Sequence, residues 1–292
     1  MNVIECTNVQ RSFASGVPIL NGLDLTVTEG SVVGLVGRNA SGKTTLLKSL
    51  LGQIRPRDGE IRVFGLDPFK EPVAVRSRIG YVAEALIFPA WLRVGEALAF
   101  HRRLYPGWDE TFEEQLVERF EIDRRAQFGK LSKGKAQQAS LICAIAHRPP
   151  LLLLDEPAGG LDPAARKAFL DVYIDLINRG QVTILLSSHD MLDVERICNE
   201  IAILHKGKML IKGELAEIRE GMTLATIPSA MSVRFKELAI SRAAFPGRND
   251  GDDIQFVLRA PLEECRASIN GGMSVKSMTL SDLFIELTGG AI

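Results

Sequence analysis

Glycines, a lysine and hydroxyl side chains cluster in residues 37–45, GRNASGKTT. The first eight residues fit the pattern G-x-x-x-x-G-K-[ST], and a helical pattern follows them. Glycines let the backbone curl so that N–H groups face phosphates, and the helix offers its positive amino end. We predict that Lys43 contacts the β- and γ-phosphates and that Thr44 ligates Mg²⁺; an ordinary Gly/Ser turn is the alternative. The predicted loop comprises Gly37, Arg38, Asn39, Ala40, Ser41, Gly42, Lys43, Thr44 and Thr45.

Two carboxylates end the apolar run LLLLDEP, residues 151–157. We predict that Asp155 holds the Mg²⁺ shell and that Glu156 deprotonates the attacking water, because proton abstraction needs a carboxylate within hydrogen-bond reach. An acidic turn after a core strand is the alternative. His189 follows another apolar run, ILLSS. By itself, a histidine at a strand end is more often a hydrogen-bonding or capping residue than a catalytic one.

Short, nearly continuous apolar runs must position these groups: SVVGLV at 31–36, LLLLD at 151–155 and VTILLSS at 182–188. Such runs are typical of strands buried on both faces. Asp162 and Pro163 predict the start of a helix that ends near Asn178, before Gly180. The alternation of strands with helices predicts a parallel α/β core.

The rest of the chain has other periodicities. Alternating apolar residues in VIECTNV (3–9) and PILNGLDLTVT (18–28) predict an antiparallel sheet. Helical periodicity occurs in residues 94–104, 111–120 and 132–147. The segment EIAILHKGKMLIKGE predicts a hairpin that turns at Lys206 and Gly207. Beyond about residue 220 we predict a small α+β element that closes with a helix in TLSDLFIELTGG.

Composition narrows the class of protein. The 292 residues are 46% hydrophobic and carry 35 basic against 36 acidic residues, so nothing attracts the whole chain to nucleic acid or anionic lipid. The four cysteines form no C-x-x-C, which disfavours a zinc knuckle or a disulfide framework and fits a reducing cytosol. Neither a signal peptide nor an apolar run of about 18 residues occurs, so we expect no export and no membrane insertion.

The order and spacing of five motifs resemble the nucleotide-binding subunit of an ABC transporter. The motifs are GRNASGKTT at 37–45, LSKGKAQQ at 131–138, LLLLDEP at 151–157, GGLD at 159–162 and SSHD at 187–190. The resemblance covers roughly residues 1–220. It implies an α/β P-loop NTPase core of ABC type, with an antiparallel β subdomain and a helical subdomain at about 85–148. Residues 221–292 would form a small C-terminal extension, and ATP and Mg²⁺ would be the cofactors.

The resemblance also implies roles for single residues. The family signature, which closes over the γ-phosphate of ATP bound to the other subunit, corresponds to Ser132, Lys133 and Gly134. Asp162 resembles the D-loop aspartate at that interface, and His189 resembles the switch histidine that contacts the γ-phosphate. Phe13 matches the aromatic residue that stacks on adenine; a plain core residue is the alternative.

Three features depart from the family pattern. Lys133 and Lys135 occupy the third and fifth signature positions, where LSGGQ is usual. Cations at a helix start cost about 0.3–1 kcal/mol each, but they could favour a bound triphosphate or simply be solvated. Glu84 replaces the usual glutamine; its carboxylate can still ligate Mg²⁺ or its water, but cannot donate a hydrogen bond while ionised. Gly159 and Gly160 begin the D-loop, which suggests a pliant interface.

The resemblance implies partners as well. Two copies must meet head to tail to complete two ATP sites, and separate integral membrane permease subunits must supply the membrane spans, which places the chain peripherally on the cytoplasmic face of the cell membrane. Residues 85–91, ALIFPAW, correspond to the place where this family receives a coupling helix; core packing of Ile87 and Phe88 is the alternative.

The motifs YPGWD, LSKGK and TLSDLFIELTG resemble the ATPases of bacterial ABC-2-type exporters. An importer ATPase, with the C-terminal extension as a regulatory domain, is the nearer alternative. A non-transport ABC ATPase that acts on ribosomes or DNA is disfavoured, because only 88 positions (131 minus 43) separate Lys43 from the signature, which leaves no room for an insertion or duplication. We therefore expect no nucleic-acid partner.

Overall fold

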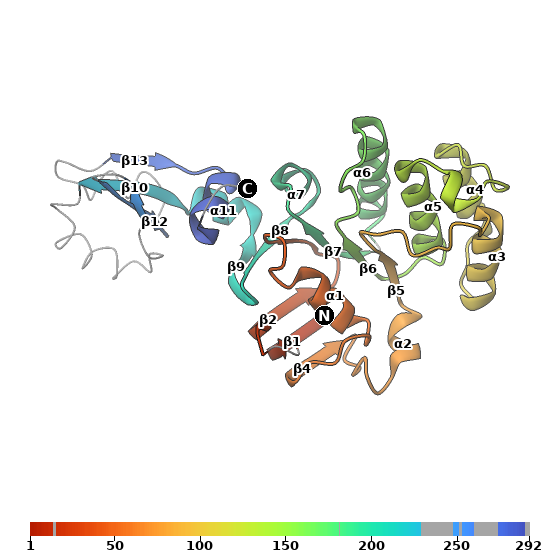
Figure 1. Ribbon diagram of the computed structural model, residues 1–292, viewed down its shortest axis with the longest axis horizontal. Coiled ribbons are helices and arrows are strands. Elements are labelled where there is room, and N and C mark those ends of the chain that lie inside the picture. The colour runs from red at the N-terminus through yellow and green to blue at the C-terminus, as the bar shows by residue number, and fades with distance from the viewer. Residues whose placement is uncertain (14–15, 181, 229–247, 251–252, 260–273, 290–292) are drawn as a thin grey trace. The chain divides into compact units, whose positions relative to one another are not determined.

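The computed structural model describes residues 1–292 apart from 14–15, 181, 229–247, 251–252, 260–273 and 290–292 (Figure 1). The chain forms two compact units, Met1–Ile211 and Lys212–Ile292. Within the described ranges, no helix has both the length and the apolar character needed to span a bilayer. The described cysteines, Cys6, Cys143 and Cys198, are buried free thiols, whereas Cys265 falls outside the described residues.

A six-stranded sheet with the order β5-β6-β7-β3-β8-β9 contains the predicted buried strands. Neighbouring strands from β5 to β8 run parallel. All residues of β3, β6 and β7 are buried, which confirms the prediction from their continuous apolar runs. The strands are β3 (Val32–Val36), β5 (Ile79–Val82), β6 (Leu151–Asp155), β7 (Thr183–Ser188), β8 (Glu200–His205) and β9 (Lys208–Glu214).

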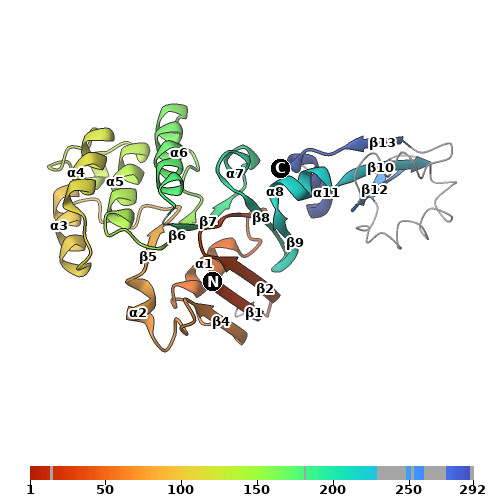
Figure 2. The same ribbon diagram turned by 180° about the vertical axis from the view of Figure 1, so that it is seen from behind.

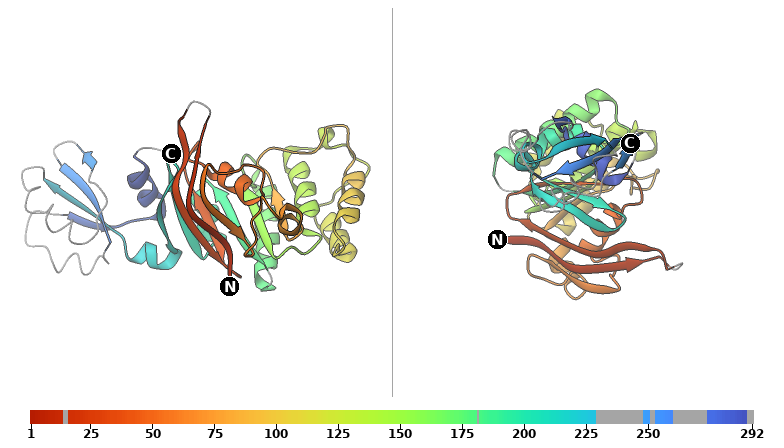
Figure 3. Two further views of the ribbon diagram at one scale, coloured as in Figure 1. Left: turned by 90° about the horizontal axis from the view of Figure 1, so that it is seen from below. Right: turned by 90° about the vertical axis from the view of Figure 1, so that its left-hand side faces the viewer.

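A second sheet is antiparallel, as the alternation of apolar residues predicts. Its order is β2-β1-β4, and β1 and β2 run side by side in Figure 3. Its strands are β1 (Asn2–Ser12), β2 (Pro18–Thr28) and β4 (Asp58–Val63). The helix α1 (Lys43–Leu50) packs its leucines into one buried cluster with side chains of both sheets. This packing fixes the start of α1, and with it the predicted phosphate loop, at the end of β3.

Helices α3, α4 and α5 lie together in Figure 2. They are α3 (Val94–Leu104), α4 (Glu110–Arg119) and α5 (Lys133–Ile145), with the short 3-10 helix η1 (Phe128–Lys130) before α5. Glu113 on α4 is fully buried and accepts hydrogen bonds from Trp108 (2.6 Å), Arg102 (3.0 Å) and Arg124 (2.5 Å). Burial alone would raise the pKa of Glu113, but these hydrogen bonds hold it below its usual value. The ionised carboxylate therefore ties the helices together.

The remaining helices of the first unit are α2 (Pro72–Arg76), α6 (Pro163–Asn178) and α7 (Met191–Ile197). Asp162 caps α6 by accepting from the N–H groups of Ala164 (3.0 Å) and Ala165 (2.9 Å), as its position before a proline predicts. The hairpin from β8 to β9 turns at Lys206 (φ 48°) and Gly207 (φ 76°). Two consecutive left-handed residues form the tight turn that suits the twist of a hairpin.

The second unit contains a four-stranded sheet with the order β11-β12-β10-β13. Its elements are α8 (Leu215–Glu220), β10 (Thr223–Pro228), β11 (Arg248–Asp250), β12 (Asp253–Leu258), β13 (Ser274–Ser277) and α11 (Leu280–Thr288). Thr279 and Asp282 form a capping box at the start of α11, and Gly289 ends it in the left-handed region (φ 73°). The predicted closing helix is thus confirmed. The loop predicted over FPGRNDGDD lies partly outside the described residues.

Candidate nucleotide-binding site

The loop after β3 curls into a cradle whose geometry depends on its glycines. Gly42 has a φ of 111°, and a Cβ at Gly37 would lie 2.4 Å from Ser41 Oγ and 2.5 Å from the Leu204 carbonyl. Ala40 holds the left-handed region without being glycine (φ 62°), which costs about 1–2 kcal/mol. Ser41 Oγ is buried and, among the described residues, has no hydrogen-bond partner. The cradle therefore contains strain and an unpaired polar atom that a phosphate oxygen would satisfy.

A cleft of about 340 Å³ opens beside this loop. Its lining brings together most of the residues that the sequence predicts for the nucleotide. The lining residues, of which Ile19 was not predicted, are Phe13, Ile19, Arg38, Asn39, Ala40, Ser41, Gly42, Lys43, Thr44, Thr45, Glu84, Glu156 and His189. They come from segments more than a hundred positions apart, so the cleft exists only because β3, β6 and β7 end at the same edge of the sheet.

Lys43 begins α1 with its ammonium group inside the cradle. Its Nζ donates to the Gly37 carbonyl at 2.6 Å and lies 3.2 Å from the Glu156 carboxylate. The side chains of Lys43 and Glu156 are only 7% and 9% exposed. Lys43 thus neutralises the buried Glu156 carboxylate, whose negative charge would otherwise repel phosphates at this place.

Asp155 ends β6 beside the phosphate loop. Its Oδ1 accepts from Thr44 Oγ1 at 3.1 Å and from Ser187 Oγ at 2.8 Å. A hydroxyl and a carboxylate next to a phosphate cradle are oxygen ligands of the kind that Mg²⁺ takes together with substrate phosphates. The part of the chain that the structure describes contains no group of three His, Cys, Asp or Glu side chains that could hold a metal ion.

Glu156 occupies a strained backbone position, with a φ of 45°. Its N–H donates to Ser187 Oγ at 3.0 Å. Its Oε2 lies 2.7 Å from His189 Nδ1, and the His189 backbone N–H donates to the same oxygen at 3.3 Å. An ionised carboxylate only accepts, so Nδ1 carries the proton and Nε2 faces away from this contact. Glu156 is thereby held between a lysine and a histidine.

Phe13 and Glu84 lie at the edge of the same cleft. Phe13 is 60% exposed, so the structure excludes the alternative of a core residue. Glu84 is exposed and follows β5. Burial, followed by the charges of Asp155 and Glu84, raises the pKa of Tyr81, so both carboxylates act on one neighbourhood.

Comparison with known proteins places this arrangement in a family. A family profile described as "ABC transporter" matches residues 20–159. The uncharacterized ABC transporter ATP-binding protein YhaQ of Bacillus subtilis (strain 168) is 33% identical over 284 residues, which cover 92% of this chain and 93% of that protein. The chain belongs to the ABC transporter ATP-binding proteins. It is therefore an ATPase.

Other relatives of this ABC ATPase match over different lengths. The Nod factor export ATP-binding protein I of Rhizobium sp. (strain N33) is 31% identical over 301 residues, which cover 98% of this chain and 97% of that protein. The solved ATP-binding cassette MJ0796, a dimer in a post-hydrolysis state with ADP and Pi, has a TM-score of 0.65. It covers 73% of this chain and 98% of its own at 22% identity, so it shows the shared fold.

The residues that the resemblance assigns to the signature and the D-loop do not line the cleft. Ser132 is the N-cap of α5, and its Oγ accepts from the Lys135 N–H at 3.2 Å. A Cβ at Gly134 would lie 2.9 Å from the Ala165 Cβ, so glycine allows α5 to approach the start of α6. Asp162 caps α6. Ser132 and Asp162 are therefore exposed outside the cleft of their own chain, whereas Gly134 is buried.

Sequence reasoning missed two contributors to the site. Ser187, fully buried on β7, joins Asp155 and the Glu156 backbone. The motif SSHD could have indicated it, because Ser187 pairs with Asp155 across the parallel strands. The contact between Lys43 and Glu156 has no signal in the sequence.

Proposed function

We propose that this chain is the ATP-hydrolysing subunit of a bacterial ABC-2-type exporter. Two copies would pair head to tail and bind separate membrane permease subunits at the cytoplasmic face of the cell membrane. The observation that carries the proposal is the incomplete site: the cleft holds the phosphate loop, Glu156 and His189, while Ser132 lies outside it. A second copy would bring its Ser132 to the open side of the cleft.

The contacts suggest what each residue does when ATP enters. The phosphates compete with Glu156 for Lys43, which is 3.2 Å from that carboxylate. Once the lysine binds the β- and γ-phosphates, the Glu156 carboxylate is free to accept a proton from the attacking water. His189 holds the other carboxylate oxygen and keeps Nε2 for the γ-phosphate. Thr44 and Asp155 would hold Mg²⁺, which would supply charge neutralisation of the phosphates. Glu84 is a further oxygen at the cleft.

Ser132 suits a role across a dimer. Its oxygen already accepts the Lys135 N–H, which orients the side chain and leaves its O–H proton to donate. The N-terminus of α5 adds a positive end that favours phosphate. Hydrolysis removes the γ-phosphate that both copies contact, so the dimer opens. This opening changes the conformation of the bound permease.

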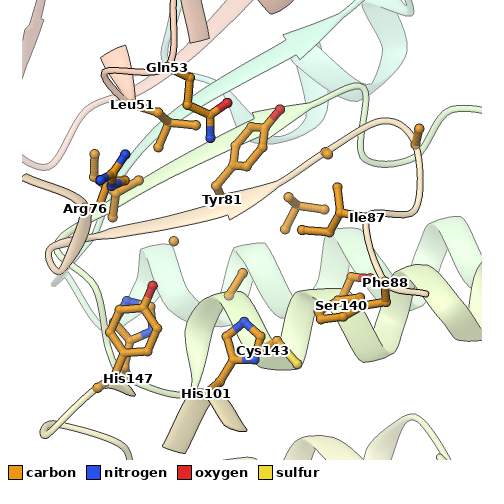
Figure 4. A pocket seen from close by; sticks show the side chains of 17 residues that line it. Leu51, Gln53, Arg76, Tyr81, Ile87, Phe88, His101, Ser140, Cys143 and His147 are labelled. Carbon is orange, nitrogen blue, oxygen red and sulfur yellow. The ribbon is translucent and has the colours of Figure 1, made fainter. Parts of the chain in front are cut away.

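A second cleft, of about 170 Å³, suits the permease (Figure 4). Tyr81 on β5 lines one wall, while His101 on α3 and Cys143 on α5 line the other. Ile87 at its edge is 62% exposed, and Trp91 in the same segment is 69% exposed. Large apolar side chains that are exposed within one short segment are typical of an interaction site.

The alternative of core packing applies to only one residue of this segment. Phe88 stacks on Phe128 with a centroid distance of 4.4 Å, whereas Ile87 is exposed. We infer that Phe88 anchors the segment and that Ile87 and Trp91 meet the membrane subunit.

Export, rather than import, is supported by a relative that covers 98% of the chain and is named for Nod factor export. An importer ATPase remains the alternative. The balanced charge of 35 basic and 36 acidic residues gives no support to a partner such as ribosomal RNA or DNA.

Purification from native membranes tests the proposal. We expect the wild-type chain to co-purify with an integral membrane protein and without a periplasmic binding protein. Ile87→Glu should lose that partner, because a charge would be buried at the interface. Leu192→Glu is the matched control, since Leu192 is 71% exposed on α7. Recovery of a binding protein would indicate an importer, and recovery of ribosomes or DNA would refute both transport functions.

A further inference from the structure

Lys133, the first residue of α5, is tied to the D-loop of its own chain. Its Nζ donates to the Gly159 carbonyl at 2.6 Å. Gly159 belongs to the loop that joins β6 to α6. Lys133 is exposed, but its ammonium group is held by a carbonyl of its own chain, a contact that the sequence did not predict.

The D-loop turn under Lys133 closes on the proposed catalytic base. The Gly159 N–H donates to the Glu156 carbonyl at 3.0 Å. Gly160 holds the left-handed region (φ 68°), and a Cβ there would lie 2.8 Å from Lys133 Nζ. Glycine adopts this backbone without strain, and a side chain at 160 would displace the end of Lys133. A continuous chain of contacts runs from the signature through Gly159 to Glu156.

The other signature lysine points elsewhere. Lys135 Nζ donates to the Phe120 carbonyl, the C-cap of α4, and lies 3.9 Å from Glu121. A cation at a helix C-terminus is favourable, so Lys135 joins α5 to α4. The two lysines have the same charge on the same first turn of α5, but only Lys133 contacts the D-loop.

We propose that Lys133 is a positioning residue that couples the signature of a subunit to Glu156 of the same subunit. The inference rests on the proposed dimer in one respect: there, the signature closes over the nucleotide of the second copy. Closure at one ATP site then fixes Gly159, and through its N–H the strained Glu156 backbone at the other site. Lys133 is the polar link by which one site prepares the base of the other.

Three variants, Lys133→Met, Lys133→Arg and Lys135→Met, test this role in the full chain. The first measurement is amide hydrogen exchange over residues 158–161 without nucleotide. The second is steady-state ATP hydrolysis, with kcat, KM and the Hill coefficient determined separately. The third is ATP-dependent dimerisation in the Glu156→Gln background.

Loss of a hydrogen bond from a charged donor changes the corresponding equilibrium constant by about tenfold. We therefore expect Lys133→Met to speed exchange at Gly159 about tenfold, to lower kcat by a similar factor, to leave KM near its wild-type value and to lower the Hill coefficient toward 1. Lys133→Arg should restore these values, because its guanidinium can also donate to a carbonyl. Lys135→Met should leave exchange at 158–161 unchanged.

Two outcomes would overturn the inference. One is wild-type exchange at 158–161 in Lys133→Met. The other is a raised KM or weaker dimerisation without faster exchange, since Lys133 would then be a nucleotide ligand. Failure of Glu156→Gln itself to dimerise with ATP would refute the proposed function. The exchange measurement, made without nucleotide, would still decide whether Lys133 positions the loop at Gly159.

Discussion

Replacing Lys43 with methionine should destabilise the nucleotide-free protein, because it leaves the Glu156 carboxylate buried without its cation. Removing one partner of a buried ion pair costs about 3–5 kcal/mol. Glu156 keeps His189 at 2.7 Å, so we expect the lower end, about 3 kcal/mol. In the double variant, Glu156→Gln removes the unpaired charge and should recover about 1–2 kcal/mol relative to the sum of the single effects.

Urea unfolding at pH 7.5, without ATP or Mg²⁺, measures these free energies. The exposed Lys70 (77% exposed) provides the control, and Lys70→Met should change stability by less than about 0.5 kcal/mol. ATP at a hundred times its Kd should stabilise the wild type by about 2.7 kcal/mol and Lys43→Met by much less. The claim of a stabilising buried pair would be refuted if Lys43→Met lowered the free energy of unfolding by less than about 1 kcal/mol and if the effects of Lys43→Met and Glu156→Gln added in the double variant.

Three further predictions concern stability. Burial lowers the pKa of His147 to about 4 from 6.5, so between these values only the unfolded chain binds the proton. The free energy of unfolding, measured in urea, should therefore fall by about 2–3 kcal/mol between pH 7.5 and pH 4.5. His147→Phe should largely remove this loss. Glu113→Ala should lower the free energy of chemical unfolding by about 3 kcal/mol. The control is Glu114→Ala, which should change it by less than about 0.5 kcal/mol because Glu114 is 71% exposed. Ala40→Gly should relieve left-handed strain and raise thermal stability by up to about 1 kcal/mol, and a loss would contradict the strain.

The elements of the fold follow from local patterns. The helix expected at 94–104 is α3 (Val94–Leu104), and the turn at Lys206 and Gly207 lies where the hairpin pattern puts it. Such features depend on neighbouring residues, whose periodicity and turn chemistry are written in the sequence. The sequence did not predict the short helices α2 (Pro72–Arg76) and α8 (Leu215–Glu220), because five or six residues are too few to show a helical periodicity.

The contacts of the site were predictable only where a motif names them. The hydrogen bond between Thr44 and Asp155 joins residues 111 positions apart, and the motif supplies both. The partner of Lys133 and the left-handed backbone of Glu156 depend on how the β6–α6 loop packs against α5, which no local pattern encodes. The sequence therefore predicted most of the residues that line the cleft, but not the contact that links Lys133 to the loop after Glu156.

The central claim is that Glu156 is the base of an ATP site completed by a second copy. Analytical ultracentrifugation of Glu156→Gln with ATP and Mg²⁺, coupled to phosphate release from the same sample, tests it most directly. We predict a persistent dimer of the 32.0 kDa chain and hydrolysis slowed by about 10²–10⁴-fold. A monomer that hydrolyses ATP at nearly the wild-type rate would contradict the account.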